Sequence, residues 1–184
     1  MIAAGAVLTH NAPPNAILAG NPARIVGYEG AKAQPAVASI VPADVSEVTV
    51  DGVHLVRLPL IDDARGMLSF GEIEKHVPFE IKRYFLVFNV PSKDIRGEHA
   101  HKTLHQFLVC VHGRCHVVAD DGDTRQEFIL DNPTVGIYLP PMVWATQYKY
   151  TEDAVLLVLA SEPYDSDDYI RDYSAFLQLA ASRR

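Results

Sequence analysis

The sequence of 184 residues has few cysteines and no long apolar run. Cys110 and Cys115 are its two cysteines, and no apolar stretch has the length of a membrane-spanning helix. The N-terminus also lacks the basic region and the cleavage-site pattern of a secretory signal. We therefore expect a cytoplasmic protein without membrane contact, in which both thiols stay reduced inside a core.

Basic residues are outnumbered by acidic ones. The chain has 16 Lys and Arg against 23 Asp and Glu, which gives a formal net charge of −7. Nucleic-acid binding requires a basic face, so this balance argues against a nucleic-acid partner. A few local arginines can still bind a small anionic ligand. The hydrophobic share of 48% predicts a folded globular chain.

Residues 1–30 differ in composition from the rest of the chain. Short apolar and small residues alternate with glycine at a period near six, which is typical of a parallel β-helix. With its closing GNPARIVG at residues 20–27, the segment resembles the last coils of a left-handed β-helix, as in a hexapeptide-repeat acyltransferase. The catalytic coils are absent, so we expect a remnant without acyltransferase activity. The alternative is an apolar arm with chance glycines. Residues 31–47, rich in Ala, Pro and Ser, predict a linker.

From residue 48 onward the pattern indicates β-structure. A hairpin is expected at Asp51-Gly52, and apolar strands are expected over 83–90 and 154–161. Two more strands are expected within 105–122, with turns near His112-Gly113 and at Asp121-Gly122. Many short strands with frequent turns predict a sandwich or barrel. The tail, 165–184, predicts a helix that acidic residues open and arginines close.

The chemically richest segment is 96–102, RGEHAHK. Its two histidines, His99 and His101, are two residues apart and point to one face of a strand. The pair is close to the first cupin motif, in which metal-binding members add an acid and a third histidine. Here Gln106 replaces the acid, and the second motif (136–146, GIYLPPMVWAT) has no histidine. We therefore expect neither a metal nor another cofactor, and the histidines are left for proton transfer.

Moving a carbonyl between adjacent carbons requires a base at one carbon, an acid at the next, and donors for the enediolate oxygen. The histidine pair is suited to the proton steps. Arg96, directly before the pair, and Tyr84, on the preceding strand, are candidates for the donors.

Residues 48–184 resemble the nucleotide-sugar 3,4-ketoisomerases of the cupin superfamily, the WxcM-like family. The resemblance rests on segments spread over nearly all of this region. These are 63–72 (DARGMLSFGE), 78–84 (PFEIKRY), 96–102 with Gln106, 137–144 (IYLPPMVW) and 164–173 (YDSDDYIRDY). It implies an all-β cupin jelly roll, a sandwich or barrel, with a short C-terminal helix.

The resemblance also implies an activity and partners. The substrate is a dTDP-4-keto-6-deoxyhexose, which a metal-independent isomerase converts to its 3-keto isomer. The product then serves an aminotransferase and an acyltransferase of deoxyamino-sugar synthesis. The family further implies a homodimer, with N-terminal strands exchanged and part of each pocket supplied by the other chain.

By resemblance, the expected catalytic residues are His99, His101, Tyr84 and Arg96. Which histidine serves C3 and which serves C4 stays open. The expected substrate-binding residues are Arg65, Gln106, Met142, Trp144 and Arg83. For Arg65 the alternative is a salt bridge at a strand end, and for Met142 and Trp144 it is core packing.

Three competing functions remain at this point. A metal-dependent cupin oxygenase requires the acid and the third histidine that this chain lacks. A non-catalytic module that holds a sugar nucleotide for an acyltransferase predicts binding without turnover. A 3,5-epimerase shares the substrate class, but it normally pairs a lone base with an opposed tyrosine.

Overall fold

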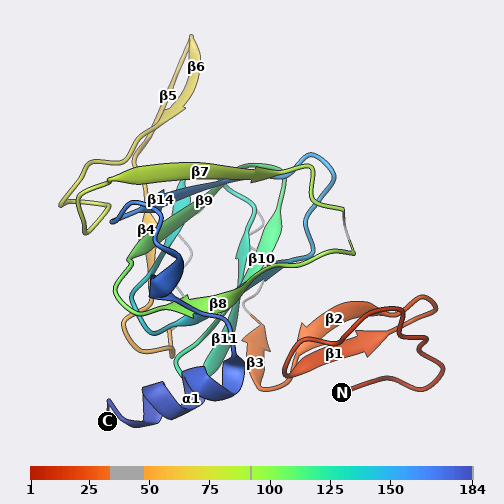
Figure 1. The fold of residues 1–184 in the computed structure, drawn as a ribbon. Coiled ribbons are helices and arrows are strands. Elements are labelled where there is room, and N and C mark those ends of the chain that lie inside the picture. The colour runs from red at the N-terminus through yellow and green to blue at the C-terminus, as the bar shows by residue number, and fades with distance from the viewer. Residues whose placement is uncertain (34–47, 92, 184) are drawn as a thin grey trace.

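The computed structural model describes residues 1–33, 48–91 and 93–183, and its centre consists of two facing β-sheets (Figure 1). The six-stranded sheet has the order β15 (Tyr169–Ile170), β8 (Arg96–His101), β13 (Trp144–Tyr148), β10 (Cys115–Asp120), β11 (Arg125–Leu130) and β3 (Ala31–Ala33). The five-stranded sheet has the order β4 (His54–Arg57), β12 (Val135–Leu139), β9 (Gln106–His112), β14 (Val155–Ala160) and β7 (Arg83–Phe88).

The main core lies between these two sheets. Alternate side chains of the central strands point inward, as the period of two in a strand dictates. The largest fully buried members include Leu108 of β9, Val117 of β10, Phe128 of β11, Ile137 of β12 and Leu156 of β14. Two β-sheets closed around one core confirm the expected all-β jelly roll.

Strands β9 and β10 follow one another in the chain but belong to different sheets. The predicted turn at His112-Gly113 is therefore a crossing between sheets rather than a hairpin. Gly113 has φ +66, and a Cβ there would collide with the Thr151 hydroxyl and the Ala154 backbone, so the crossing requires glycine. Cys110 and Cys115 are both free and fully buried, which confirms the expected core position of the pair.

The hairpins differ in part from expectation. The predicted turn at Asp121-Gly122 joins β10 to β11. A turn also exists at Asp51-Gly52, but the expected hairpin there is wrong, because β4 pairs with β12, which is remote from it in the chain. A hairpin not foreseen from the sequence, β5 (Leu60–Asp63) with β6 (Gly66–Ser69), projects away from the barrel (Figure 1).

The C-terminal tail is only partly helical, which corrects the expectation of one helix over 165–184. A short 3-10 turn, η1 (Ser166–Asp168), and β15 come first, and α1 (Tyr173–Ala181) follows. The Asp172 side chain caps α1 by accepting from the Ala175 backbone N–H at 2.7 Å. Phe176 and Ala180 of α1 then pack with Trp144 on the outer face of the six-stranded sheet.

The N-terminal segment packs on the outside of the same sheet. Its two strands, β1 (Ala16–Ala19) and β2 (Arg24–Tyr28), are antiparallel, and an isolated parallel bridge joins Ile2 to Leu18. Tyr28 meets Tyr148 of β13 edge to face at 5.2 Å. β3, the first three residues of the expected linker, pairs in parallel with β11. The rest of that linker lies outside the described residues, and the β-helix coils stay a prediction.

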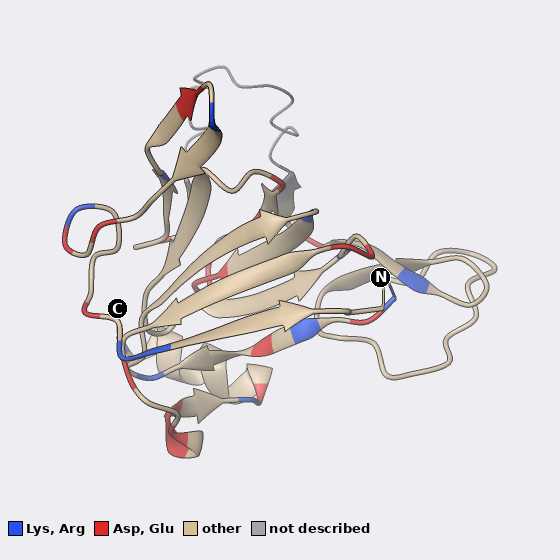
Figure 2. Ribbon diagram, turned by 90° about the horizontal axis from the view of Figure 1, so that it is seen from above, with Lys and Arg blue, Asp and Glu red and all other residues tan. Residues whose placement is uncertain are grey.

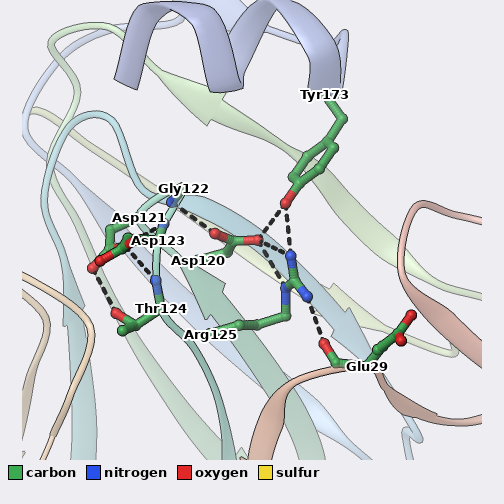
Figure 3. Close-up of polar contacts among 8 residues, drawn as sticks. All are labelled: Glu29, Asp120, Asp121, Gly122, Asp123, Thr124, Arg125 and Tyr173. Carbon is green, nitrogen blue, oxygen red and sulfur yellow. Dashed lines mark hydrogen bonds and ion pairs between the residues drawn. The ribbon is translucent and has the colours of Figure 1, made fainter. Parts of the chain in front are cut away.

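Arg125 joins three parts of the chain where the N-terminal segment packs on the six-stranded sheet (Figure 3). Its guanidinium binds the Asp120 carboxylate, with Nε to Oδ2 at 2.8 Å, and donates to the backbone carbonyl of Glu29. It also donates to the Tyr173 hydroxyl at 2.7 Å, which itself donates to Asp120 at 2.6 Å. One buried ion pair therefore links the N-terminal segment, the β10–β11 hairpin and α1.

Charged residues are concentrated outside the barrel body. Figure 2 shows Lys, Arg, Asp and Glu mainly at strand ends and in loops, whereas the broad strands are mostly uncharged. Within the described ranges, none of the helices has the length and apolar character needed to cross a membrane.

Candidate active site

The two histidines of β8 lie side by side, as their spacing predicts. The ring centroids of His99 and His101 are 4.8 Å apart, with the ring planes at 88°. Ala100 between them points the other way, into the cluster under α1. The strand thus places both imidazoles on one face and isolates them from the helix on the opposite face.

His101 is almost fully enclosed. Its Nδ1 lies 2.8 Å from Oδ2 of Asp168, whose Oδ1 accepts hydrogen bonds from the Thr103 N–H and hydroxyl, each at 2.8 Å. The other ring nitrogen, Nε2, is buried and has no hydrogen-bond partner among the described residues. Burial and the neighbouring His99 lower the pKa of His101 to about 4, although Asp168 opposes the shift. The imidazole is therefore neutral at pH 7.

His99 has a neutral partner. Its Nδ1 lies 2.9 Å from the Gly97 carbonyl oxygen, and burial lowers its pKa as well. Gly97 has φ +81, and a Cβ there would approach the Ala145 carbonyl oxygen to 2.6 Å. The close pairing of β8 with β13 therefore depends on glycine at this position.

Tyr169 covers both histidines. Its ring centroid is 4.8 Å from that of His99 and 4.4 Å from that of His101, and the Arg171 guanidinium lies 4.1 Å from the tyrosine centroid. Sequence reasoning missed Asp168 and Tyr169 as site residues, because the acidic run 165–168 was interpreted as a helix N-terminus. The available signal was the segment 164–173, one of the pieces that carries the family resemblance.

Two hollows meet at this cluster. An interior cavity of about 350 Å³ is lined by His99, Gln106, Arg96 and Tyr169, together with apolar side chains of β7, β9 and β14. A second hollow of about 300 Å³ at the rim is lined by His101, Arg83, Tyr164, Asp168 and Tyr169, among others. The structure therefore brings together five of the predicted residues: both histidines, Arg96, Gln106 and Arg83.

Of the two neighbours Arg83 and Tyr84, the arginine is the one that reaches the site. The Arg83 guanidinium lies over the rings of Phe85 and Tyr164, at 5.4 and 5.5 Å, and its buried Nε has no partner within the described part of the chain. Tyr84 points to the opposite face of β7 and is 68% exposed. Within one chain, Tyr84 is not next to the histidines.

The other predicted binding residues lie outside both hollows. Trp144 packs against Tyr173 and Phe176 at 5.1 and 5.6 Å, and Met142 joins the same cluster. Trp144 also lines a third hollow, of about 730 Å³, that His99 and Tyr169 border. Arg65 is at the tip of the β5–β6 hairpin and forms an exposed ion pair with Asp63 at 2.6 Å. For these three residues, the structure displays the contacts of the simpler alternatives: core packing and a salt bridge.

The donor set is suited to proton transfer. Across residues 1–33, 48–91 and 93–183, no group of three or more His, Cys, Asp or Glu side chains is arranged to hold a metal ion. Two neutral imidazoles instead adjoin a buried amide and a half-buried guanidinium. Imidazoles are general acid–base groups in many enzymes, and a guanidinium can stabilise developing negative charge.

Comparison with known proteins places the barrel among enzymes. The family model described as FdtA, WxcM-like, C-terminal matches residues 51–181. The TDP-4-oxo-6-deoxy-alpha-D-glucose-3,4-oxoisomerase of Aneurinibacillus thermoaerophilus is 44% identical over 127 residues, which cover 69% of this chain and 91% of that protein.

Solved structures agree with this match. A mutant of the 3,4-ketoisomerase QdtA from Thermoanaerobacterium thermosaccharolyticum, in complex with TDP-4-keto-6-deoxyglucose, superposes with a TM-score of 0.71 at 38% identity. The alignment covers 73% of this chain and 97% of that one. A 3,4-ketoisomerase from Helicobacter canadensis gives a TM-score of 0.69 at 36% identity, covering 72% of this chain and 98% of that one.

Proposed function

This chain belongs to the FdtA family of WxcM-like C-terminal domains, and from that premise we propose that it is a dTDP-sugar 3,4-ketoisomerase. Its substrate is a dTDP-linked 4-keto-6-deoxyhexose, and its product is the 3-keto isomer. The observation that carries the proposal is the pair His99 and His101. Both imidazoles are neutral, their ring centroids are 4.8 Å apart, and they lie where the interior and rim hollows meet.

The proposed reaction moves two protons and no net electrons. A neutral histidine of the pair removes the proton from C3, and a C3–C4 enediolate forms as negative charge develops on O4. The O3 proton passes to O4, which becomes a hydroxyl, a proton is delivered to C4, and the carbonyl is left at C3. Acid–base assistance of this kind contributes about 10²–10⁴-fold to the rate.

Arg83 and Arg96 are the proposed stabilisers of sugar oxygens and phosphate. Arg83 is the better placed of the two for this role, because it lines the rim hollow with His101 and its guanidinium lies over two aromatic rings. One preorganised donor to a developing oxyanion contributes roughly 3 kcal/mol. Gln106, buried in the interior cavity beside His99, is proposed to hydrogen-bond the sugar.

We further propose that the enzyme is a homodimer. Strand β7 is the last strand of its sheet, and its outer face exposes Tyr84, Leu86 and Phe88. The projecting β5–β6 hairpin also exposes apolar side chains, Ile61, Met67 and Leu68 among them. A second copy that covers these surfaces removes apolar area from water and protects a free edge. Arg65 and Tyr84 would then act in the site of the partner subunit.

The C3 carbonyl of the product is open to amination. A ketone at C3 is the substrate of an aminotransferase, and the resulting amine is the substrate of an N-acyltransferase. We propose that this enzyme serves such a sequence in deoxyamino-sugar synthesis. The glycine-rich segment 1–30 supports a relation to a fused acyltransferase through its repeat pattern alone.

The test is proton NMR of dTDP-4-keto-6-deoxyglucose mixed with the full chain in deuterated buffer, with and without EDTA. The proposal expects a 3-keto product at the same rate in both samples. Binding without conversion would instead support the non-catalytic module, and turnover that EDTA abolishes would support a metal-dependent enzyme. Exchange at C5 would indicate an epimerase.

A further inference from the structure

We propose that Asp168 is a positioning residue, which holds the proton of His101 on Nδ1 and leaves the Nε2 lone pair as the base of the reaction. This inference rests on the proposed function and assigns a role to a residue outside the expected HxH pair. Asp168 belongs to η1, which is 67 positions from His101 along the chain but adjoins it in space.

The hydrogen bonds around Asp168 determine which ring nitrogen carries the proton. An ionised carboxylate only accepts hydrogen bonds, and burial is outweighed by the bonds from Thr103 and His101, so that the pKa of Asp168 is lowered. Oδ1 receives both Thr103 donors, and Oδ2 faces Nδ1 of His101 at 2.8 Å. Nδ1 must therefore be the donor, and the neutral ring has no proton on Nε2.

The other end of the ring indicates a use for that lone pair. Nε2 of His101 is buried without a partner among the described residues, although native structures satisfy most buried polar atoms. His101 lines the rim hollow with Arg83 and Tyr169, and the tyrosine ring at 4.4 Å limits rotation of the imidazole. An oriented and unpaired base beside a cation is the arrangement that proton abstraction next to a carbonyl requires.

The two histidines differ in this respect. The Nδ1 atom of His99 meets the Gly97 carbonyl, which is neutral, whereas that of His101 meets a carboxylate. A carboxylate on the far nitrogen stabilises the imidazolium that forms when the near nitrogen takes a proton. Asp168 therefore favours charge on His101 during the reaction, while the resting ring stays neutral.

A simpler role for Asp168 is to fasten η1 to the end of β8. Two sets of contacts suit that role. The Asp168 carboxylate accepts from Thr103, and the backbone carbonyl of Asp168 accepts from the Lys102 N–H at 2.9 Å. Fastening alone requires acceptors for Thr103 but sets no tautomer on His101. The two roles therefore separate in the substitution Asp168→Asn. Its single carbonyl oxygen can still accept from Thr103, but its amide then donates to Nδ1 and moves the ring proton to Nε2.

The experiment combines ring nitrogen-15 NMR of ligand-free protein with kinetics on dTDP-4-keto-6-deoxyglucose. In the native chain we expect His101 with a protonated Nδ1 and a bare Nε2. In Asp168→Asn we expect the opposite tautomer, a fall in kcat of about 10²–10⁴-fold and a KM within a few-fold of the native value. The matched control is Asp167→Asn, which alters an exposed acid next to Asp168 in η1 that lines neither the rim hollow nor the interior cavity. It should match the native chain in both readouts.

A proton on Nε2 in the native spectrum overturns the inference, and this readout requires no variant to fold. Native kcat in a folded Asp168→Asn protein also overturns it. If the native chain shows the expected tautomer but does not convert the sugar, the proposed function fails while the Asp168–His101 geometry stands. The spectrum and the turnover assay thus distinguish the two failures.

Discussion

The barrel and the N-terminal segment differ in the size of the hydrophobic core that each one buries. The barrel closes two sheets over one large core, whereas the N-terminal segment contributes the buried apolar side chains Ala16, Leu18 and Tyr28 to a small cluster with β10 and β13. The family model begins at residue 51, and the two solved ketoisomerases are covered over nearly their whole length by 73% and 72% of this chain. The proposed chemistry therefore depends on the barrel, and the N-terminal segment is an addition to its outer face.

The largest effect is expected from Gly97→Ala, which disturbs the contact between β8 and β13 in the barrel. The new Cβ would lie 2.6 Å from the Ala145 carbonyl oxygen, and φ +81 is strained for alanine. We expect β8 to shift from β13, the free energy of unfolding to fall by about 3 kcal/mol, and turnover to be lost with the His99 geometry. Urea unfolding and the NMR assay measure both effects. Gly71→Ala is the control, since its Cβ meets nothing nearer than 3.5 Å. Equal stability of the two variants would show that the β8–β13 contact tolerates a side chain.

Arg125→Met tests the joint between the two regions. The substitution leaves the Asp120 carboxylate, 3% exposed, without its cation and releases the Glu29 carbonyl. Breaking a buried ion pair costs about 3 kcal/mol, so the urea midpoint should fall, and amides of β3 should exchange faster. Arg114→Met, at an exposed arginine, should stay within about 0.5 kcal/mol of the native chain. An unchanged midpoint in Arg125→Met would show that this pair does not connect the regions.

His101 makes barrel stability depend on pH. Its folded pKa is about 4 against an unfolded value of 6.5, so between these values the unfolded chain binds more protons. Stability contributed by this residue therefore rises as pH increases from about 4 to about 6.5. The free energy of unfolding is measured for the native chain and for His101→Asn at pH 4.5 and 7. We expect the native value to exceed that of the variant by about 2 kcal/mol more at pH 7 than at pH 4.5. A difference that does not change with pH would place the His101 pKa near its ordinary value.

The smallest effect is expected from loosening the N-terminal segment alone. Leu18→Ala removes a buried side chain from the cluster with Val118 and Tyr148. We expect local opening to become easier by about 2 kcal/mol, seen as faster amide exchange in β1 and β2. Turnover should stay within twofold of native. Val26→Ala, at an exposed position of β2, is the control. A large loss of kcat in Leu18→Ala would make the segment part of the catalytic apparatus.

Local patterns in the sequence predicted most of the barrel. Apolar runs and turn residues placed β7, β9, β10 and β14, and the i, i+2 spacing placed His99 and His101 on one face. Strand pairing over long distances was not available from such patterns. Nothing near Asp51-Gly52 indicates that β4 pairs with β12, and nothing near Gly113 indicates a change of sheet.

The same limit applies to the site. Arg83 and Tyr84 are adjacent in sequence, and only the register of β7 decides which one faces the histidines. Asp168 was interpreted as a helix-opening acid because its partner, His101, is remote in the chain. Contacts made by folding back across the barrel require the three-dimensional structure.

The most direct test of the central claim is conversion of dTDP-4-keto-6-deoxyglucose in deuterated buffer by the native chain, His99→Asn, His101→Asn and His105→Asn. His105 lies outside both hollows, hydrogen-bonded to Tyr138, and provides the matched control. We predict a 3-keto product with solvent deuterium at C4 from the native chain and the control, and a loss of turnover of about 10²-fold or more in the other two variants. Native rates in both His99→Asn and His101→Asn would contradict proton transfer through this pair.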